Sequence, residues 1–144
     1  MIRLICEDFI GRWSITRRIH DNLNGSVSYF FGEADIKKEG LHFRYEEQGK
    51  LNLRGNATLK AKQSYFWRPV GNTIFDIFFN NGDYFHKLDL GIAEKSDLCF
   101  AEHLCKSDLY RVHYSLAQFP DWRTIWCVTG PRKKYEIFNH FEQI

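Results

Sequence analysis

The feature that most constrains this chain is a regular recurrence of turn signals, about one every ten residues, between segments of alternating apolar and polar side chains. Glycine, asparagine and proline supply these signals, because they suit the torsion angles of tight turns. The signals fall at residues 22–25, 38–40, 54–56, 69–72 and 80–83. A period of two residues between closely spaced turns is typical of antiparallel strands joined in a meander.

Ten segments fit this pattern of a strand between turns. They are residues 11–20, 26–36, 41–53, 57–67, 73–80, 84–90, 97–103, 108–116, 122–129 and 133–141. We expect a bulge at Gly49, because glycine inside a strand often marks one. Pro69, Pro120 and Pro131 each fall in a predicted connection, where a residue without an N–H does not interrupt a ladder.

The predicted sheet has two edges and no helix long enough to cover one of its faces. Closure into a barrel removes both edges. The sequence therefore predicts an all-β fold, an antiparallel up-and-down β-barrel of about ten strands in a single domain over residues 1–144. A sandwich of two sheets is the alternative fold.

The N-terminal residues follow a different period. Ile2, Ile5, Cys6 and Phe9 recur at helical spacing before Gly11 ends the pattern. We expect a short helix over residues 1–10 that plugs one end of the barrel formed by residues 11–144.

The distribution of charged and apolar residues argues against nucleic acid and membrane as partners. The chain has 20 Lys and Arg against 18 Asp and Glu, and its basic doublets are separated by acids, so we expect no nucleic-acid partner. No apolar run approaches the ~20 residues of a membrane span, and no secretory signal precedes Gly11. We therefore expect a cytoplasmic protein whose four cysteines are reduced.

The turns of an up-and-down barrel alternate between its two ends, which predicts where the mouth lies. One end receives the turns at 21–25, 54–56, 80–83, 103–108 and 129–132. The N-terminal plug lies at the other end, the base. We expect Arg18, His20, Arg132 and Lys133 near the mouth.

The inner wall is predicted from the alternation along each strand. Aromatic residues make up 17% of the chain, and many fall on the inward positions together with a few polar groups. That mixture is usual in small-molecule pockets. The expected ligand-binding residues are Arg17, Tyr45, Glu47, Tyr65, Trp67, His86, Tyr110, Tyr114, Trp126, Arg132 and Lys133, and the expected structural residues are Gly11 and Trp13.

Three polar groups on the inward positions have two interpretations each. Arg17 and Glu47 form a buried ion pair with each other, or they hold a ligand carboxylate and move a proton. His86 is a hydrogen-bonded core histidine, or it contacts the ligand.

The basic turn near the C-terminus also has two interpretations. Arg132 and Lys133 follow Pro131 directly. They form a solvated hairpin tip, or they overhang the mouth and attract an anionic ligand.

Metal and cofactor signals are weak. Cys99, His103 and Cys105 lack the paired spacing of a zinc site, so no metal is expected. A cysteine nucleophile lacks any recognisable oxyanion hole. We expect no cofactor, with haem ligated by His86 or His103 as a minor alternative.

Several stretches resemble one protein family. These are Phe9-Ile10-Gly11-Arg12-Trp13-Ser14, Phe85-His86-Lys87-Leu88-Asp89-Leu90 and Trp126-Cys127-Val128-Thr129-Gly130-Pro131-Arg132-Lys133-Lys134-Tyr135. The chain resembles the uncharacterised domain-of-unknown-function family 6314 over nearly its whole length. The resemblance implies a small single domain and carries no established activity.

A more distant resemblance concerns Gly11-Arg12-Trp13, which is similar to the G-x-W that opens lipocalins and other calycins. In lipocalins an arginine from the end of the last strand covers this tryptophan. Arg132 begins the last predicted strand here, so His140 or Arg123 would have to take that place, or the packing differs. The strand number looks closer to fatty-acid-binding proteins and nitrobindins than to the eight-stranded lipocalins.

These observations lead to three hypotheses of function. The first is a cytoplasmic barrel that binds a small, partly apolar, anionic molecule, with a homodimer left open. The second is a barrel enzyme, a lyase, isomerase or cyclase, which resembles phenolic acid decarboxylases in its use of Tyr, Arg and Glu. The third is a protein-interaction module that uses its outer face.

Overall fold

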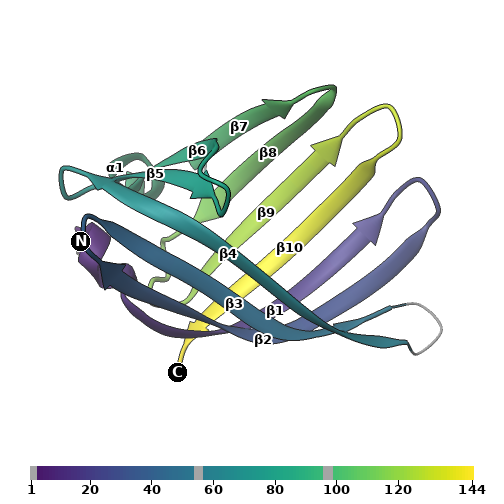
Figure 1. Ribbon diagram of the computed structural model, residues 1–144, viewed down its shortest axis with the longest axis horizontal. Coiled ribbons are helices and arrows are strands. Elements are labelled where there is room, and N and C mark those ends of the chain that lie inside the picture. The colour runs from purple at the N-terminus through teal and green to yellow at the C-terminus, as the bar shows by residue number, and fades with distance from the viewer. Residues whose placement is uncertain (1–2, 54–56, 96–98) are drawn as a thin grey trace.

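A computed structural model describes residues 3–53, 57–95 and 99–144 of the chain. Ten antiparallel strands form one continuous sheet that curls into a nearly closed barrel (Figure 1). The elements are η1 (Cys6–Phe9), β1 (Gly11–Asp21), β2 (Ser26–Glu39), β3 (His42–Asn52), β4 (Thr58–Val70), β5 (Ile74–Phe79), β6 (Tyr84–Asp89), α1 (Leu90–Lys95), β7 (Cys99–Cys105), β8 (Asp108–Ser115), β9 (Trp122–Thr129) and β10 (Lys134–Gln143). The predicted all-β up-and-down barrel is confirmed, and the sandwich is excluded by the single sheet.

Pairing between the first and last strands joins the ten strands into one continuous sheet. β1 pairs with β2 on one side and with β10 on the other, and Arg17 lies opposite Phe30 and Asn139. The order of the strands begins at β6 and ends at β7, so the seam of the barrel lies between these two strands. Aromatic rings meet across the seam, where His103 of β7 contacts Phe79 and Phe85.

Two local predictions about the strands are wrong. Gly49 was expected in a bulge, but it pairs in register with Gly32 and with Ala61. The irregular register lies instead between Ile77 and Phe78. Pro69 was expected in a connection, but β4 continues to Val70 and Pro69 pairs with Phe75 near the strand end, where a missing N–H is tolerated.

The N-terminal plug is a single 3-10 turn. With three residues per turn, Cys6 and Phe9 share one side of η1, and both are fully buried. Ile5 precedes the turn and is exposed, contrary to the expected helical face, while Ile2 lies outside the described residues. The N–H of Cys6 donates to the carbonyl of Asn72 at 2.8 Å, which ties the plug to the turn between β4 and β5.

Phe9 is the side chain that closes the base. Its ring contacts Trp67, Phe75, Phe119 and Trp122 at centroid distances of 4.9 to 5.9 Å. The hairpin tips of β1–β2 and β9–β10 lie at the opposite end from the N-terminus (Figure 1). The predicted assignment of the base is therefore confirmed.

Gly11 and Trp13, the two residues expected to be structural, follow the plug at the start of β1. Gly11 has a φ of +143°, a torsion that side-chain-bearing residues rarely adopt. Trp13 is fully buried, and its Nε1–H donates to the carbonyl of Phe9 at 3.0 Å. Phe119 and Trp122 pack against its ring.

The residues considered as substitutes for the lipocalin arginine lie elsewhere. Trp13 faces inward on β1, but His140 lies opposite Thr16 and Arg123 lies opposite His140, all on the outward face. Packing around Trp13 therefore differs from the lipocalin arrangement.

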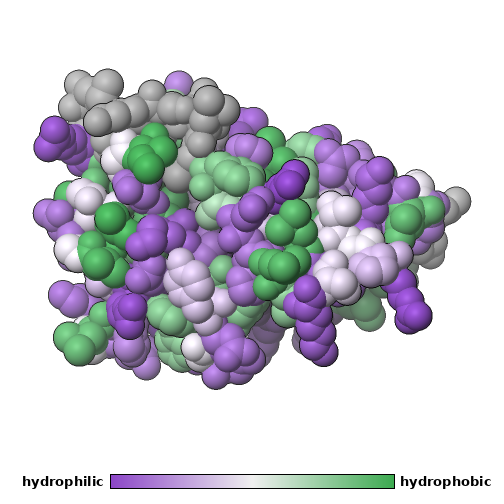
Figure 2. All heavy atoms as spheres, turned by 90° about the horizontal axis from the view of Figure 1, so that it is seen from above, coloured by the Kyte–Doolittle hydropathy of each residue, from purple (hydrophilic) through white to green (hydrophobic). Residues whose placement is uncertain are grey.

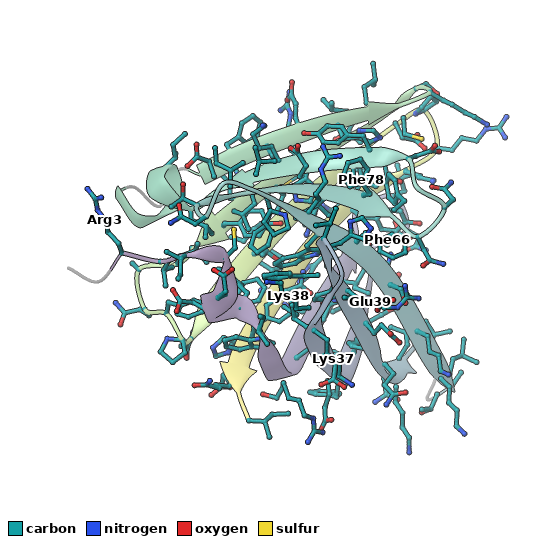
Figure 3. All side chains as sticks on the ribbon, turned by 60° about the vertical axis from the view of Figure 1, so that its left-hand side comes forward. Arg3, Lys37, Lys38, Glu39, Phe66 and Phe78 are labelled. Carbon is teal, nitrogen blue, oxygen red and sulfur yellow. The ribbon has the colours of Figure 1, made fainter. Side chains whose placement is uncertain are left out.

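The strand alternation is visible in β4 and β5. Trp67 and Ile77 are buried inside, whereas Phe66 and Phe78 pair with each other on the outer face (Figure 3). The guanidinium groups of Arg44 and Arg68 cover these outer rings at 5.1 and 5.0 Å.

No helix in the described part of the chain is long and apolar enough to cross a membrane.

Candidate functional site

The barrel encloses a cavity of about 300 Å³. Its wall runs from Trp122 and Phe141, next to the base, to Ile19 and Val128 near the β9–β10 hairpin. Nine of the eleven predicted ligand-binding residues line it, namely Arg17, Tyr45, Glu47, Tyr65, Trp67, His86, Tyr110, Tyr114 and Trp126. The period of two along the strands therefore placed these side chains on the correct face.

Arg17 and Glu47 form a two-pronged ion pair at the wall of this cavity. Nη1 of Arg17 lies 2.7 Å from Oε2 of Glu47, and Nη2 lies 2.9 Å from Oε1. Burial alone would lower the pKa of Arg17, but the hydrogen bonds and the charge of Glu47 raise it. The predicted pairing is confirmed, and the pair adjoins open space.

The pair spans an intervening strand. Arg17 is on β1 and Glu47 on β3, and β2 lies between them. Phe30 of β2 is buried, and the guanidinium of Arg17 lies 4.7 Å from the centre of its ring. Gly32 and Gly49 face each other beside that ring, and a Cβ at either position would approach its Cζ to 2.7 Å. The two glycines therefore make the space in which Phe30 supports Arg17.

Three further polar groups extend the ion pair into a network. The hydroxyl of Tyr45 donates to Oε1 of Glu47 at 2.6 Å. Nε of Arg17 donates to Oδ1 of Asn139, whose Nδ2 donates in turn to Oγ1 of Thr124 at 2.9 Å. Burial raises the pKa of Tyr45 and the Glu47 charge raises it further, so this phenol stays protonated.

Asn139 is a member of the site that sequence reasoning missed. It is 6% exposed and lies between Ile137 and Phe141 on the inward face of β10. The signal was present in the sequence, because Asn139 is the polar member of that alternating set. Its importance comes from its partners, Arg17 and Thr124, which are its cross-strand neighbours on β1 and β9.

A second polar group lies on the opposite part of the wall. His86 is 3% exposed, and its Nε2 lies 2.7 Å from the hydroxyl of Tyr114. Its Nδ1 has no hydrogen-bond partner among the described residues. Burial lowers the pKa of His86 to about 3, helped by His103 nearby, so the imidazole is neutral at physiological pH. The interpretation of His86 as a hydrogen-bonded core histidine is confirmed, and the residue also lines the cavity.

Aromatic rings form most of the remaining wall. Tyr45 and Trp67 are parallel, with centroids 5.4 Å apart. Phe85 stacks on Trp126 at 5.0 Å and an angle of 20°. Burial raises the pKa of Tyr65, and the charge of Glu47 adds to the effect. The cavity thus has flat apolar surfaces beside one dense polar network.

The cations expected at the mouth do not line the cavity. Arg132 and Lys133 are exposed on the β9–β10 hairpin, and Nζ of Lys133 lies 3.3 Å from Asp108. Arg18 and His20, also expected to help line the mouth, both contact Phe138 on the outer face. They face outward because their positions alternate with those of Arg17 and Ile19.

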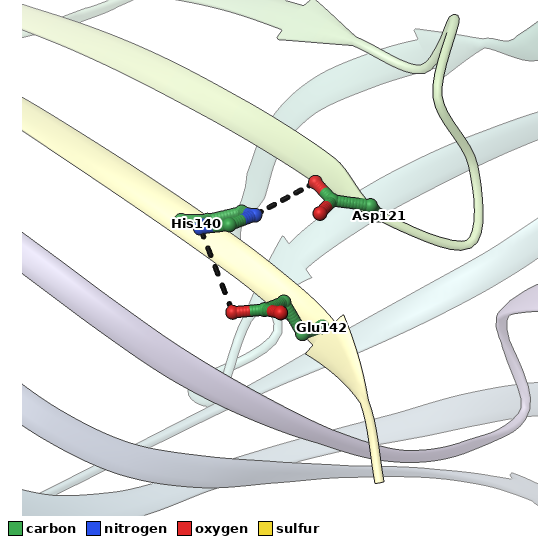
Figure 4. Close-up of side chains that lie close together, drawn as sticks. All are labelled: Asp121, His140 and Glu142. Atoms are coloured by element: carbon green, nitrogen blue, oxygen red, sulfur yellow. Dashed lines mark hydrogen bonds and ion pairs between the residues drawn. The ribbon is translucent and has the colours of Figure 1, made fainter.

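The three possible metal ligands belong to β7, which runs from Cys99 to Cys105. The side chain of Cys99 is outside the described residues, and the ring of His103 contacts Phe79 and Phe85. Asp121, His140 and Glu142 form a separate cluster on the outer surface (Figure 4). Nε2 of His140 lies 2.7 Å from Asp121 and Nδ1 lies 3.7 Å from Glu142, so the two carboxylates meet different nitrogens. This geometry is that of an imidazole held between two acids.

The outer surface is mixed in character. Apolar and hydrophilic side chains are interspersed over the face shown in Figure 2. Phe31, Leu59 and Leu104 are among the exposed apolar residues, and they come from different strands.

Comparison with known proteins identifies a solved structure of similar fold and the family of this chain. The solved structure of the S-type phycobiliprotein lyase CPES from Guillardia theta is similar with a TM-score of 0.69 and 8% identity, covering 96% of this chain and 89% of that one. At this identity the likeness concerns the fold alone. No curated protein matches the sequence. A model of the family of unknown function DUF6314 matches residues 9–143, and the chain therefore belongs to that family.

Proposed function

We propose that this protein binds a small, partly apolar molecule inside its barrel. The observation that carries the proposal is the cavity of about 300 Å³, which lies at the lower end of the range for small-molecule pockets. Its wall combines aromatic rings with the Arg17–Glu47 network, the mixture that such pockets use for affinity and orientation. Each 100 Å² of apolar ligand surface buried there contributes about 2.5 kcal/mol before the costs of association.

The shape of the wall favours a flat ligand. The stacked pairs Tyr45–Trp67 and Phe85–Trp126 present ring faces and edges, on which planar groups pack well. An anionic ligand, expected from the basic residues of the sequence, finds less support. Arg17 is already paired with Glu47, and Arg132 and Lys133 lie on the exposed hairpin.

A cytoplasmic location is part of the proposal. Cys6, Cys105 and Cys127 are free thiols in the described part of the chain, which is compatible with a reducing compartment.

A fluorescence titration tests binding. The probe is 1-aminoanthracene, an uncharged fluorophore that becomes brighter in an apolar site. Val128 is 5% exposed and lines the cavity, so Val128→Phe is expected to weaken probe binding by at least about tenfold. Ile125→Phe is the matched control, because Ile125 is 40% exposed on the outer face of the same strand. Equal binding by both variants and the parent, or no binding by the parent, would refute the proposal.

An enzyme on the same barrel is the second candidate. Arg17, Glu47 and the Tyr45 hydroxyl converge at the cavity wall within 2.6 to 2.9 Å, as an acid–base site requires. The closed ion pair occupies both carboxylate oxygens, so binding is the better-supported function. Decarboxylation of 4-hydroxycinnamic acid tests the lyase hypothesis, and the reaction is monitored as a decrease in the absorbance of this acid. Tyr45→Phe is expected to be inactive. Absence of turnover in the parent counts against it.

A further inference from the structure

The charges that line the cavity cancel. Among the described residues of the wall, Arg17 and Glu47 are the charged ones, and their contacts at 2.7 and 2.9 Å neutralise each other. His86 is neutral, and the buried phenols of Tyr45 and Tyr65 are protonated. A ligand that enters therefore meets no unbalanced charge on the described wall.

The hydrogen-bonding capacity of the pair is unequally used. A guanidinium has five N–H donors, and three of those on Arg17 are directed at Glu47 and Asn139. Two N–H groups remain. Both oxygens of Glu47 already accept from Arg17, and Oε1 also accepts from Tyr45, so about one of the four acceptor positions of the carboxylate is left.

The arginine is also the more accessible partner. The side chain of Arg17 is 14% exposed, while that of Glu47 is 5% exposed. The accessible polar group of the cavity is therefore a hydrogen-bond donor, and the ion pair to which it belongs carries no net charge.

We infer that the ligand of this cavity is an uncharged planar molecule that presents a carbonyl, amide or hydroxyl oxygen to the remaining N–H groups of Arg17. The inference rests on the proposed binding function and names the chemical class of the ligand. An uncharged oxygen accepts from Arg17 without disturbing the pair with Glu47.

A carboxylate is disfavoured at the same position for two reasons. Hydrogen bonding to Arg17 would bring its charge close to Glu47, so repulsion by the glutamate offsets attraction by the arginine. The carboxylate would also lose its hydration, and the ion pair supplies no net positive charge in compensation.

A pair of matched ligands tests the inference. 2-Naphthamide and 2-naphthoic acid share one ring system, and the acid is ionised at pH 7.5. Both compounds are titrated against the parent protein loaded with 1-aminoanthracene, and displacement of the probe is measured. We expect the amide to bind at least about tenfold more tightly than the naphthoate.

Glu47→Gln converts the site into one with a net positive charge. This variant is expected to reverse the order, so that the naphthoate binds more tightly than the amide. Glu46→Gln is the matched control, since Glu46 is exposed, pairs with Arg44 and lies on the outer face of the same strand. It should keep the order of the parent.

The parent protein alone provides a test that needs no variant to fold. Lowering the pH from 7.5 to 4.5 neutralises part of the naphthoic acid, so its affinity should rise while that of the amide stays constant.

The outcomes separate the inference from the proposed function. If the naphthoate binds the parent as tightly as the amide, or if neither displaces a bound probe, the inference is overturned while binding stands. If the probe itself does not bind, the proposed function fails.

Discussion

Gly32 of β2 and Gly49 of β3 lie directly opposite each other and leave the space in which the ring of Phe30 supports Arg17. The reach of Arg17 across β2 to Glu47 depends on this pair of residues without side chains. The central polar contact of the cavity is therefore prepared by backbone packing.

Gly49→Ala tests this dependence. A Cβ at Gly49 would lie 2.3 Å from the carbonyl oxygen of Phe31, which is backbone and cannot move freely. We expect unfolding in urea to show a loss of about 3 kcal/mol, as in overpacked cores. Gly91→Ala is the control, because the nearest atom there is 3.3 Å away on a side chain, and its effect should stay within about 1 kcal/mol. Equal effects of the two substitutions would show that the close approach is unimportant.

The buried ion pair between Arg17 and Glu47 should also affect the free energy of unfolding. Arg17→Met leaves the carboxylate of Glu47 buried and unpaired, and we expect a loss of about 3–5 kcal/mol in the free energy of unfolding. The double variant Arg17→Met/Glu47→Leu should recover most of that loss, because it removes both charges. Arg12→Met, at an exposed pair with Glu33, is expected to cost below about 1 kcal/mol. A double variant as unstable as the single one would contradict the explanation.

The lowered pKa of the buried His86 should make the stability of the protein depend on pH. In the unfolded chain this histidine binds its proton near pH 6.5, but in the folded barrel its pKa is about 3. Between these values the unfolded state binds more protons, so stability falls as the pH is lowered, by up to about 1.4 kcal/mol per pH unit for this group.

Urea unfolding at several pH values between 6.5 and 4.5 measures this slope. His86→Gln should make it shallower than in the parent. His113→Gln is the control, since His113 is only partly buried on the outer face of β8 beside Phe100. An unchanged slope in His86→Gln would mean that the histidine is not held neutral.

The plug at the base is the subject of the fourth prediction. Phe9→Ala removes a fully buried ring that contacts four other aromatic side chains, and we expect a loss of about 3–5 kcal/mol. Ile10→Ala, at a neighbour that is 39% exposed, should change stability by about 0.5 kcal/mol or less. Thermal or urea unfolding compares the two. A small effect of Phe9→Ala would show that the base is closed without the plug.

Much of the fold could be predicted because strand alternation is a local property of the sequence. The segments around Trp13, Tyr45 and Trp126 alternate with period two, and each of these residues faces the interior as expected. The same alternation places Arg18 and His20 outside, since they occupy the other set of positions on β1. The expectation that these two side chains help to line the mouth neglected that rule.

By itself, the sequence determined the strands, their inward faces and the plugged base, because turn residues and apolar periodicity act over a few neighbouring positions. Tertiary structure decided which polar groups meet. Arg17 contacts Asn139 because the register of β1 with β10 places the two residues opposite each other. It contacts Glu47 across β2, where Gly32 and Gly49 lie opposite each other. Such contacts join residues far apart in the chain, and they form only when β1 pairs with β10 and several strands come into register together, which the alternation along a single strand does not encode.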